Sequence, residues 1–145
     1  MIMVSACSAS LGSQWVRTTD GTLFWVSSVD TTMSFSWNGE SFDSVANGKG
    51  TLSGVDSEGN SQTQQFTMFY GASSIEDIVS MDDGSRFVGG IEDDKMEGFG
   101  VLNKETELYI GSFHESKPNG HLKYYKKGNL FYDGNWKDGA FWGEG

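Results

Sequence analysis

Leu108-Tyr109-Ile110-Gly111-Ser112-Phe113 is the stretch that decides the fold. It is short and rich in β-branched and aromatic residues, and its alternate positions place two aromatic rings and a glycine on one face of a strand. Residues 121–125 predict the next strand, Lys126-Lys127-Gly128-Asn129 predicts a tight turn, and residues 130–136 predict a returning strand. No segment carries a convincing helical period, so we expect an all-β fold.

The same pattern recurs with a fixed period. Gly89, Gly111 and Gly134 act as anchors that lie 22 and then 23 residues apart. Each anchor has an aromatic residue two positions before it, a bulky apolar residue two positions after it and a second glycine nine positions after it. A period of this length is typical of repeat proteins. The aromatic column holds Phe87, Tyr109 and Tyr132; position +2 holds Ile91, Phe113 and Trp136; and the second glycines are Gly98, Gly120 and Gly143.

An imperfect fourth copy lies upstream. It reproduces the aromatic, the anchor and the glycine pair, but its position +2 holds Ser41. The stretch Phe69-Tyr70-Gly71, between the two regions, keeps an aromatic residue two positions before a glycine and lacks the second glycine, so this copy is degenerate. The matching residues of the fourth copy are Trp37, Gly39, Gly48 and Gly50, and Gly100 completes the equivalent glycine pair of the copy anchored at Gly89.

These columns resemble the MORN repeat, a unit of about 23 residues with the pattern Tyr-x-Gly-x-Phe/Trp and a later Gly-x-Gly. Tyr109–Phe113 and Tyr132–Trp136 carry the resemblance most clearly. It covers residues 35–145 and is strongest after residue 84. His121 replaces the second glycine of one pair, and Ile91 replaces an aromatic residue. The resemblance implies membrane association or protein assembly, in some cases as an accessory region of a larger enzyme.

We expect stacked antiparallel β-hairpins that form one elongated single-sheet array, because a lone hairpin buries too little apolar surface to be stable in water. A glycine weakens a strand unless a ring or another backbone must approach it, so rings of neighbouring repeats are expected to lie over the anchors. The last strand would present an open edge and a risk of self-association. The expected core is a ladder of Trp37, Phe87, Tyr109, Phe113, Tyr132 and Trp136.

The predicted organisation has three parts. Residues 1–13 form a signal and tether, residues 14–34 form a β-rich cap, and residues 35–145 form the repeat region, degenerate at 53–83 and clear at 84–145. Met1–Cys7 contains Val4-Ser5-Ala6-Cys7, which resembles a bacterial lipobox, so Cys7 is the predicted lipid-attachment residue. The predicted location is the bacterial cell envelope, with the cytoplasm as the alternative. On this interpretation the sequence continues beyond both of its ends.

Composition excludes several classes of function. The chain has 145 residues with 10 basic and 20 acidic side chains, a formal net charge of −10, so a phosphate-binding basic stripe is absent and no nucleic-acid partner is expected. A single cysteine forms no internal disulfide. No phosphate-binding glycine loop of the P-loop type occurs, and no cofactor is expected.

Enzymatic chemistry has weak support. The acidic groups Asp82-Asp83, Glu92-Asp93-Asp94 and Glu105/Glu107 lie beside turn residues, where solvated loop charge is the expected interpretation. Asp56-Ser57-Glu58-Gly59-Asn60 lacks the full calcium-loop pattern. His114 and His121 have no further ligands at metal-binding spacing, so no metal site is expected. We therefore predict a non-catalytic scaffold or interaction module.

Two kinds of binding surface stay open. Aromatic residues interleaved with polar residues are candidates for carbohydrate or peptidoglycan binding, although at repeat columns they are better explained as core. A few lysines offer contact with a membrane or partner, and each such lysine is worth about 1 kcal/mol at an anionic lipid surface. The predicted partner is accordingly a protein or a membrane surface. The lysines are Lys117, Lys123, Lys126, Lys127 and Lys137.

Overall fold

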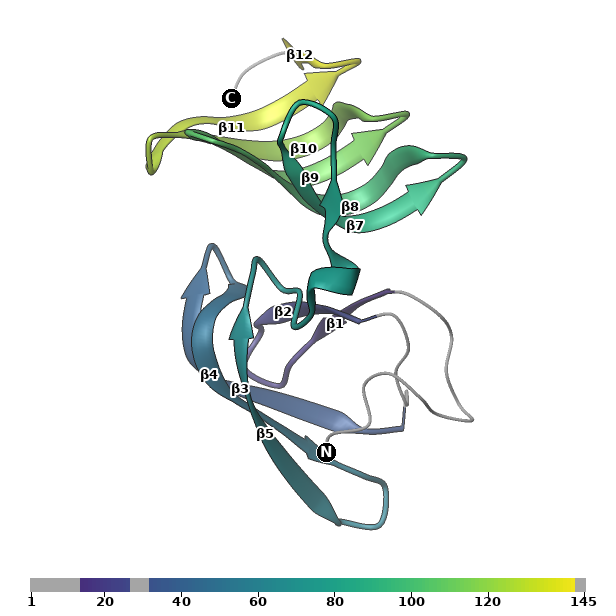
Figure 1. Cartoon of the computed structure of the whole chain (residues 1–145), viewed down its shortest axis with the longest axis vertical. Helices are drawn as coiled ribbons and strands as arrows, with labels where there is room; N and C mark the ends of the chain where they lie inside the picture. Colours follow the sequence, from purple (N-terminus) through teal and green to yellow (C-terminus); the bar gives the residue numbers. More distant parts are fainter. Residues whose placement is uncertain (1–13, 27–31, 143–145) are drawn as a thin grey trace. The chain divides into compact units, whose positions relative to one another are not determined.

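The computed structural model describes residues 14–26 and 32–142 and is almost entirely β. The strands are mostly antiparallel, and the described part of the chain contains no α-helix, only the short 3-10 helix η1. The all-β prediction is therefore confirmed (Figure 1). The chain divides into two compact units, residues 1–77 and residues 78–145, each with its own sheet. The predicted single continuous sheet is not what the strands form.

The first unit holds a mixed five-stranded sheet. Its strand order is β1-β2-β4-β3, with β5 paired to β4. The pairing of β2 with β4 is parallel and joins Leu23 to Val45, whereas the other strand pairs are antiparallel. The elements are β1 (Gln14–Arg17), β2 (Leu23–Val26), β3 (Ser34–Phe42), β4 (Val45–Val55), β5 (Ser61–Met68) and η1 (Ile75–Asp77).

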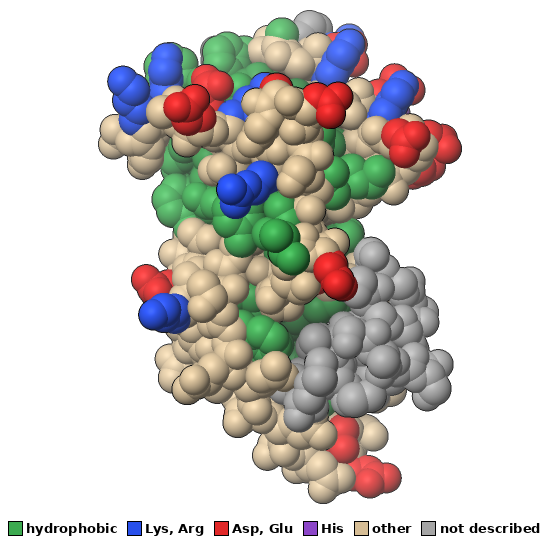
Figure 2. Space-filling view, in the orientation of Figure 1, with side chains coloured by type: hydrophobic (Ala, Val, Ile, Leu, Met, Phe, Trp, Pro, Cys, Tyr) green, Lys and Arg blue, Asp and Glu red, His purple; other side chains and the backbone are tan. Residues whose placement is uncertain are grey.

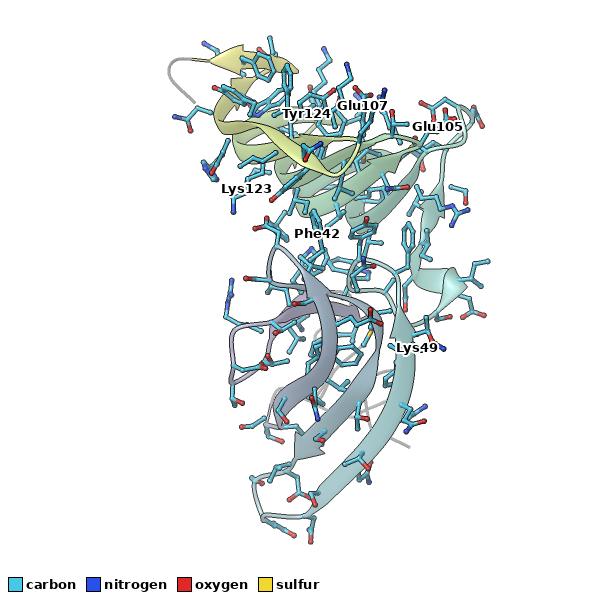
Figure 3. All side chains as sticks on the ribbon, turned by 90° about the vertical axis from the view of Figure 1, so that its left-hand side faces the viewer. Phe42, Lys49, Glu105, Glu107, Lys123 and Tyr124 are labelled. Atoms are coloured by element: carbon cyan, nitrogen blue, oxygen red, sulfur yellow. The ribbon has the colours of Figure 1, made fainter. Side chains whose placement is uncertain are left out.

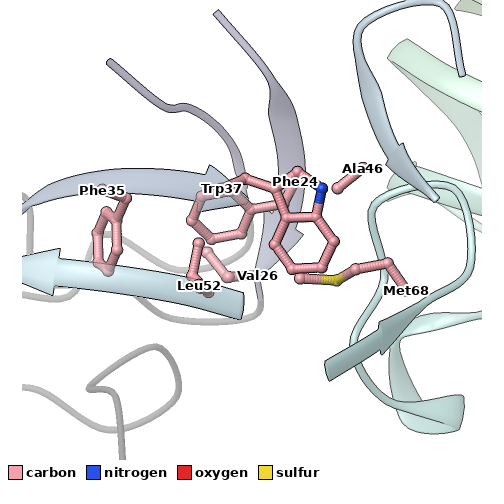
Figure 4. Close-up of a cluster of buried hydrophobic side chains, with 7 residues drawn as sticks. All are labelled: Phe24, Val26, Phe35, Trp37, Ala46, Leu52 and Met68. Carbon is pink, nitrogen blue, oxygen red and sulfur yellow. The ribbon is translucent and has the colours of Figure 1, made fainter. Parts of the chain in front are cut away.

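One cluster of buried hydrophobic side chains forms the core of the first unit. Trp37 lies at its centre, and its indole Nε1 donates a hydrogen bond to the Glu40 carbonyl oxygen at 2.9 Å. Rings and aliphatic side chains from β2, β3, β4 and β5 meet there (Figure 4). Strands β1 and β2 thus lie where the cap was predicted, and the boundary at residue 34 stays a prediction. The cluster contains Phe24, Val26, Phe35, Trp37, Ala46, Leu52 and Met68.

The second unit is a regular seven-stranded antiparallel meander. Its strand order, β12-β11-β10-β9-β8-β7-β6, follows the chain without a crossover. Every neighbouring pair is antiparallel, as expected for consecutive hairpins. The strands are β6 (Val79–Ser80), β7 (Arg86–Glu92), β8 (Lys95–Lys104), β9 (Glu107–His114), β10 (Lys117–Lys126), β11 (Asn129–Lys137) and β12 (Ala140–Trp142).

Two-residue turns set the hairpins of this meander. Asp93-Asp94, Glu115-Ser116 and Asp138-Gly139 all have positive φ at both positions, the signature of the tight turns that match strand twist. From Asp93 to Glu115 is 22 residues, and from Glu115 to Asp138 is 23. The turn at Lys127-Gly128, predicted from the sequence, connects β10 to β11 at the opposite ends of the strands. The local geometry therefore recurs with the period of the sequence.

Aromatic rings lie over several repeat glycines, as expected. Each of these rings belongs to the same hairpin as the glycine that it covers, and not to a neighbouring repeat. A Cβ atom on Gly50 would come within 2.5 Å of the Trp37 ring, and one on Gly89 within 2.8 Å of the Phe87 ring. Gly111 differs, because a Cβ there would meet the β10 backbone, at 2.5 Å from the His121 carbonyl oxygen. The expected stacking by rings of neighbouring repeats is thus replaced by packing within a hairpin and by close backbone approach.

The remaining repeat glycines that the structure describes lie in the two sheets, except Gly71. Gly39 pairs with Gly50 across β3 and β4, and Gly100 pairs with both Gly89 and Gly111. Gly134 pairs with Leu122. Gly71, by contrast, lies in a turn after β5 with φ +94°. Gly48, Gly98 and Gly120 lie within strands with positive φ, and Gly143 lies outside the described residues.

Replacement of Gly111 by valine is expected to destabilise the second unit by roughly 3 kcal/mol or more. The new side chain would overlap the β10 backbone, and φ at this position is +152°, which favours glycine. Thermal unfolding followed by circular dichroism measures the loss. Gly128→Asn is the matched control, because its Cβ meets no atom within 4 Å and asparagine tolerates a positive φ. A wild-type melting temperature for Gly111→Val would contradict the close packing of Gly111 against the β10 backbone.

Candidate functional site

Aromatic side chains of the second unit pack from one hairpin to the next. Phe87 of the first hairpin contacts Phe113 of the second, with ring centroids 5.4 Å apart. Tyr109 of the second hairpin contacts Trp136 of the third, with centroids 5.9 Å apart. In both pairs the residue two positions before an anchor glycine meets, edge to face, the residue two positions after the next anchor. Such contacts contribute beyond the area that they bury.

The aromatic residues predicted to form the core differ in burial. Phe87, Phe113 and Trp136 are buried in the second unit, and Trp37 is buried in the first. Tyr109 and Tyr132 are only half-buried and pack against the edge of the cluster. The two tyrosines therefore combine a packing role with surface available for contact.

The last two strands carry a partly exposed aromatic surface, which we call the aromatic strip: Phe131 and Phe141, which are exposed, Tyr132, which is half-buried, and Trp136, which is buried and contacts Tyr132 and Phe141. Phe131 is 64% exposed and Phe141 is 49% exposed. Tyr132 lies between them in the chain and contacts Phe141, with ring centroids 4.1 Å apart. Hydrophobic side chains remain visible on the surface of the second unit (Figure 2). Clustered exposed apolar groups of this kind mark interaction sites.

A register irregularity exposes Phe131. Between β10 and β11 the pairing passes from Tyr124↔Tyr132 to Tyr125↔Leu130, so Phe131 has no direct partner on β10. The extra residue is a β-bulge, which redirects side chains. The Phe131 ring still lies edge-on against Tyr124, at 5.6 Å between centroids. The strip thus continues onto the ring of Tyr124.

A polar group borders the strip at the β8–β9 turn. The Tyr124 hydroxyl donates a hydrogen bond to the Glu107 carboxylate, and this bond raises the pKa of Tyr124 (Figure 3). Tyr109 stacks on Tyr124 with centroids 4.7 Å apart, and Lys104 Nζ lies 5.8 Å from the centre of the Tyr109 ring. Burial is the main cause that raises the pKa of Tyr109. Here a carboxylate and an ammonium group flank two aromatic rings.

Glu107 and Lys104 also line an open cavity of about 580 Å³. Its wall combines both signs of charge, and the pKa of Asp83 in this wall is lowered by hydrogen bonds from the Ser85 side chain and backbone. Charged walls of both signs suit a polar ligand better than an apolar one. The lining residues are Asp83, Gly84, Ser85, Arg86, Asn103, Lys104, Glu105, Thr106 and Glu107.

The predicted lysines do not gather into one patch. Lys117 begins β10 and Lys126 ends it, which separates them by about 30 Å at the usual rise per residue. Lys127 lies in the turn after β10, and Lys137 lies at the other end of the strands, where β11 ends. Lys123 pairs with Ile110 and Asp133, so strand alternation places it on the other face from Tyr124. Blue and red side chains are interspersed on the second unit in Figure 2.

Glu97 and His114 form an exposed pair that the sequence did not reveal. His114 Nδ1 lies 3.0 Å from Glu97 Oε1, and Glu97 Oε1 also accepts a hydrogen bond from the Glu115 backbone N–H at 2.9 Å. That backbone bond, followed by the bond from His114, lowers the pKa of Glu97. The bond to Glu97 raises the pKa of His114. The two residues are 17 apart, and only the register of β8 with β9 brings them together.

Other polar candidates have structural partners. Asp56 Oδ1 accepts hydrogen bonds from the backbone N–H groups of Glu58 and Asn60, each at 2.9 Å, so this segment is a turn, as expected. His121 Nε2 lies 2.9 Å from Asp133 Oδ1. Residues 14–26 and 32–142 contain no group of three or more side chains placed to hold a metal ion. Cys7 lies outside these residues.

The aromatic strip as a surface was not predicted from the sequence. Phe131 is adjacent to a column aromatic, and Phe141 follows the last turn, but neither occupies a repeat column. The one available signal was the Phe131-Tyr132 pair, because alternation would expose one of two adjacent rings in a half-buried strand.

Comparison with known proteins adds no relative: no protein-family model and no curated protein matches the chain. Among the described residues, no helix is long and apolar enough to cross a membrane.

The Glu97–His114 pair is expected to make stability depend on pH. The raised pKa of His114 stabilises the fold below its ordinary value of 6.5, and this contribution is lost as the pH rises through the folded-state pKa. The lowered pKa of Glu97 stabilises the fold above 4.5 and is lost as the pH falls. The destabilising effect of His114→Gln should therefore be largest between pH 4.5 and pH 6.5.

Melting temperatures of wild type and His114→Gln across this range measure the effect. Because both side chains are at the surface, added salt should reduce it. Glu105→Gln, an exposed carboxylate in the neighbouring turn, is the control and should show no such window. A wild-type to His114→Gln difference that stays constant with pH would contradict the pairing.

Proposed function

We propose that this chain is a non-catalytic interaction module of the MORN-repeat type, which presents the aromatic strip to a partner protein. The observation that carries the proposal is the exposure of Phe131 and Phe141, with the half-buried Tyr132 in contact with Phe141, on a sheet that has a well-packed core. Large rings lose little conformational entropy on binding and supply much contact area, so they are common at interface centres. The regular meander provides a rigid support for them.

The repeat interpretation has support from local geometry. The turns of the second unit recur at the spacing of the anchor glycines, and the ring pairs Phe87–Phe113 and Tyr109–Trp136 are equivalent by position. Backbone bonds recur as well, since Ser116 N–H donates to the Met96 carbonyl oxygen and Gly139 N–H to that of Pro118. We infer that residues 84–145 form a stacked MORN-type array, and that the mixed first sheet is a divergent continuation of it.

A protein partner is favoured over a lipid surface. The lysines are distributed over both ends of strands β10 and β11 and over two faces of the sheet, and the chain carries a net charge of −10. An anionic membrane attracts clustered lysines, and its field falls off within a Debye length. The strip, in contrast, is contiguous. The groups around Glu107 keep carbohydrate binding as the second candidate, because sugars combine apolar ring faces with hydroxyl groups that suit Tyr109, Glu107 and Lys104.

A photo-crosslinking phenylalanine analogue in place of Phe131 tests this function in cells. We expect discrete adducts of higher mass with a protein, and no such adducts when the analogue replaces Ile75, which is 83% exposed in the first unit and outside the strip. Adducts that glycosidases remove would support carbohydrate binding instead. Equal crosslinking from both positions, or none, would reject the strip as a functional surface.

We further propose that a lipid on Cys7 holds the module at the bacterial envelope. The support is the lipobox-like sequence before this cysteine. In bacteria that express the native gene, metabolically supplied radiolabelled palmitate should label the protein, and Cys7→Ser should abolish the label and release the protein from the membrane fraction. Because serine lacks the thiol that would carry the lipid, this single change removes the whole anchor, and release should be detectable. Identical fractionation of the two forms would contradict the anchor.

A further inference from the structure

One face of the first unit is lined mainly by hydroxyl groups. Alternate residues of β3, β4 and β5 point away from the buried cluster, because side chains alternate along a strand. Seven of these eleven residues are serine or threonine, two carry an amide, and the other two are Lys49 and Val55. We call this surface the hydroxyl face. It consists of Ser34, Ser36, Asn38, Lys49, Thr51, Ser53, Val55, Ser61, Thr63, Gln65 and Thr67.

The residues of the hydroxyl face form rows across the three strands. Antiparallel pairing places the members of each row side by side on neighbouring strands, which are about 4.8 Å apart. Hydroxyl and amide groups therefore recur at a fixed interval across the sheet. The rows are Ser34–Val55–Ser61, Ser36–Ser53–Thr63 and Asn38–Thr51–Gln65, and Lys49 pairs with Thr67 beside them.

The polar side chains of this face are not engaged within the described part of the chain. None of them makes a hydrogen bond or an ion pair with another residue in 14–26 or 32–142. Thr51 and Ser53 are half-buried, and the other nine residues are exposed. The neighbouring carboxylate of Glu40 is turned to the backbone, where its Oε1 accepts a hydrogen bond from the Lys49 N–H at 2.9 Å. The hydroxyls and amides are thus available to a ligand as donors and as acceptors.

The hydroxyl face is hollowed between β4 and β5. An open cavity of about 520 Å³ lies there, which is within the range of about 300–1,000 Å³ typical of small-ligand sites. Two cross-strand pairs of the face, Thr51 with Gln65 and Lys49 with Thr67, contribute to its wall, and Lys49 is labelled in Figure 3. The lining residues are Lys49, Gly50, Thr51, Gln65, Phe66 and Thr67.

The chemistry of this face selects the class of ligand. An apolar partner would desolvate the hydroxyls and amides without replacing their hydrogen bonds to water, which is unfavourable. A polyanion is bound through several cationic side chains, and Lys49 is the single cation of the face. A neutral ligand rich in hydroxyl groups satisfies the same donors and acceptors without these costs. In an extended β-linked glycan, successive sugar rings recur at nearly the interval between neighbouring strands.

We propose that the hydroxyl face binds a neutral β-linked glycan chain, whose successive sugar rings lie across β3, β4 and β5. Thr51 and Gln65 contact it at the centre of the face, beside the cavity. Each hydrogen bond at such an open surface competes with water, so the contribution of one contact is small. Affinity therefore depends on many contacts along the chain. This site is separate from the aromatic strip and does not depend on the function proposed for the strip.

Nuclear magnetic resonance titration of the isotope-labelled full chain tests the proposal, with cellohexaose and chitohexaose as probes. At least one probe should shift backbone signals of β3, β4 and β5, with a dissociation constant of about 1 mM or below. The double variant Thr51→Val/Thr67→Val keeps the β-branched shape and removes two hydroxyls, so it should bind at least about fivefold more weakly. Ser57→Ala, which removes an exposed hydroxyl in the β4–β5 turn outside the face, should bind as wild type does. Thermal unfolding verifies that the variants fold.

Two further variants separate this proposal from its alternatives. Lys49→Gln should retain binding of the neutral probe, and added salt should leave that binding unchanged. Preferential binding of polygalacturonate that is lost with Lys49→Gln or with salt would assign the face to an anionic ligand and overturn the proposal. Loss of binding with Glu107→Gln, but not with Thr51→Val/Thr67→Val, would place the glycan at the cavity beside Glu107 and also overturn it.

The remaining outcomes separate this site from the strip. The proposal is overturned if neither probe shifts the β3, β4 and β5 signals at concentrations up to several times about 1 mM. Protein adducts from position 131 in that case would retain the interaction function of the strip. Probe-induced shifts without such adducts would support the glycan site and reject the strip. Both results together would support two independent binding surfaces.

Discussion

Close approach between strands at glycine is the constraint on which both sheets depend. Trp37 lies over the paired Gly39 and Gly50 in the first unit, and Phe87 lies over the paired Gly89 and Gly100 in the second. A side chain at any of these positions would overlap a ring or a backbone atom. The glycines therefore lower the intrinsic stability of their strands, and the buried aromatic rings compensate for that loss. The spacing of the glycines then fixes where each ring can be placed.

This constraint explains which parts of the fold were predictable. Turn residues and alternating strands are local signals, so the hairpins around Lys127-Gly128 and Asp138-Gly139 could be derived from sequence. The first unit could not, because the parallel pairing of Leu23 with Val45 joins segments that no local pattern links. Tyr70-Gly71 shows the same limit. Its spacing fits an anchor, but the pairing of β5 with β4 leaves it in a turn.

The candidate surface was predictable only in part. Column positions identified Tyr132 and Trp136, whereas the exposure of Phe131 results from a bulge whose position depends on the register of β10 with β11. The Glu97–His114 pair likewise depends on register, since 17 residues separate its members. Sequence periodicity specifies which residues are equivalent. It does not specify which of the equivalent residues is left uncovered.

The uncovered residues carry the functional information in a repeat array, because each unit satisfies its neighbours and only the ends stay unsatisfied. Phe113 and Trp136 occupy equivalent positions and are buried, and Ile91, at the third such position, is exposed. An aliphatic residue at the exposed position limits how strongly this end attracts another surface, since it offers less contact area than the rings that fill the interior positions. The rings at the interior positions therefore account for the packing between hairpins, and Ile91 contributes little to it, because its side chain is smaller and remains partly solvated.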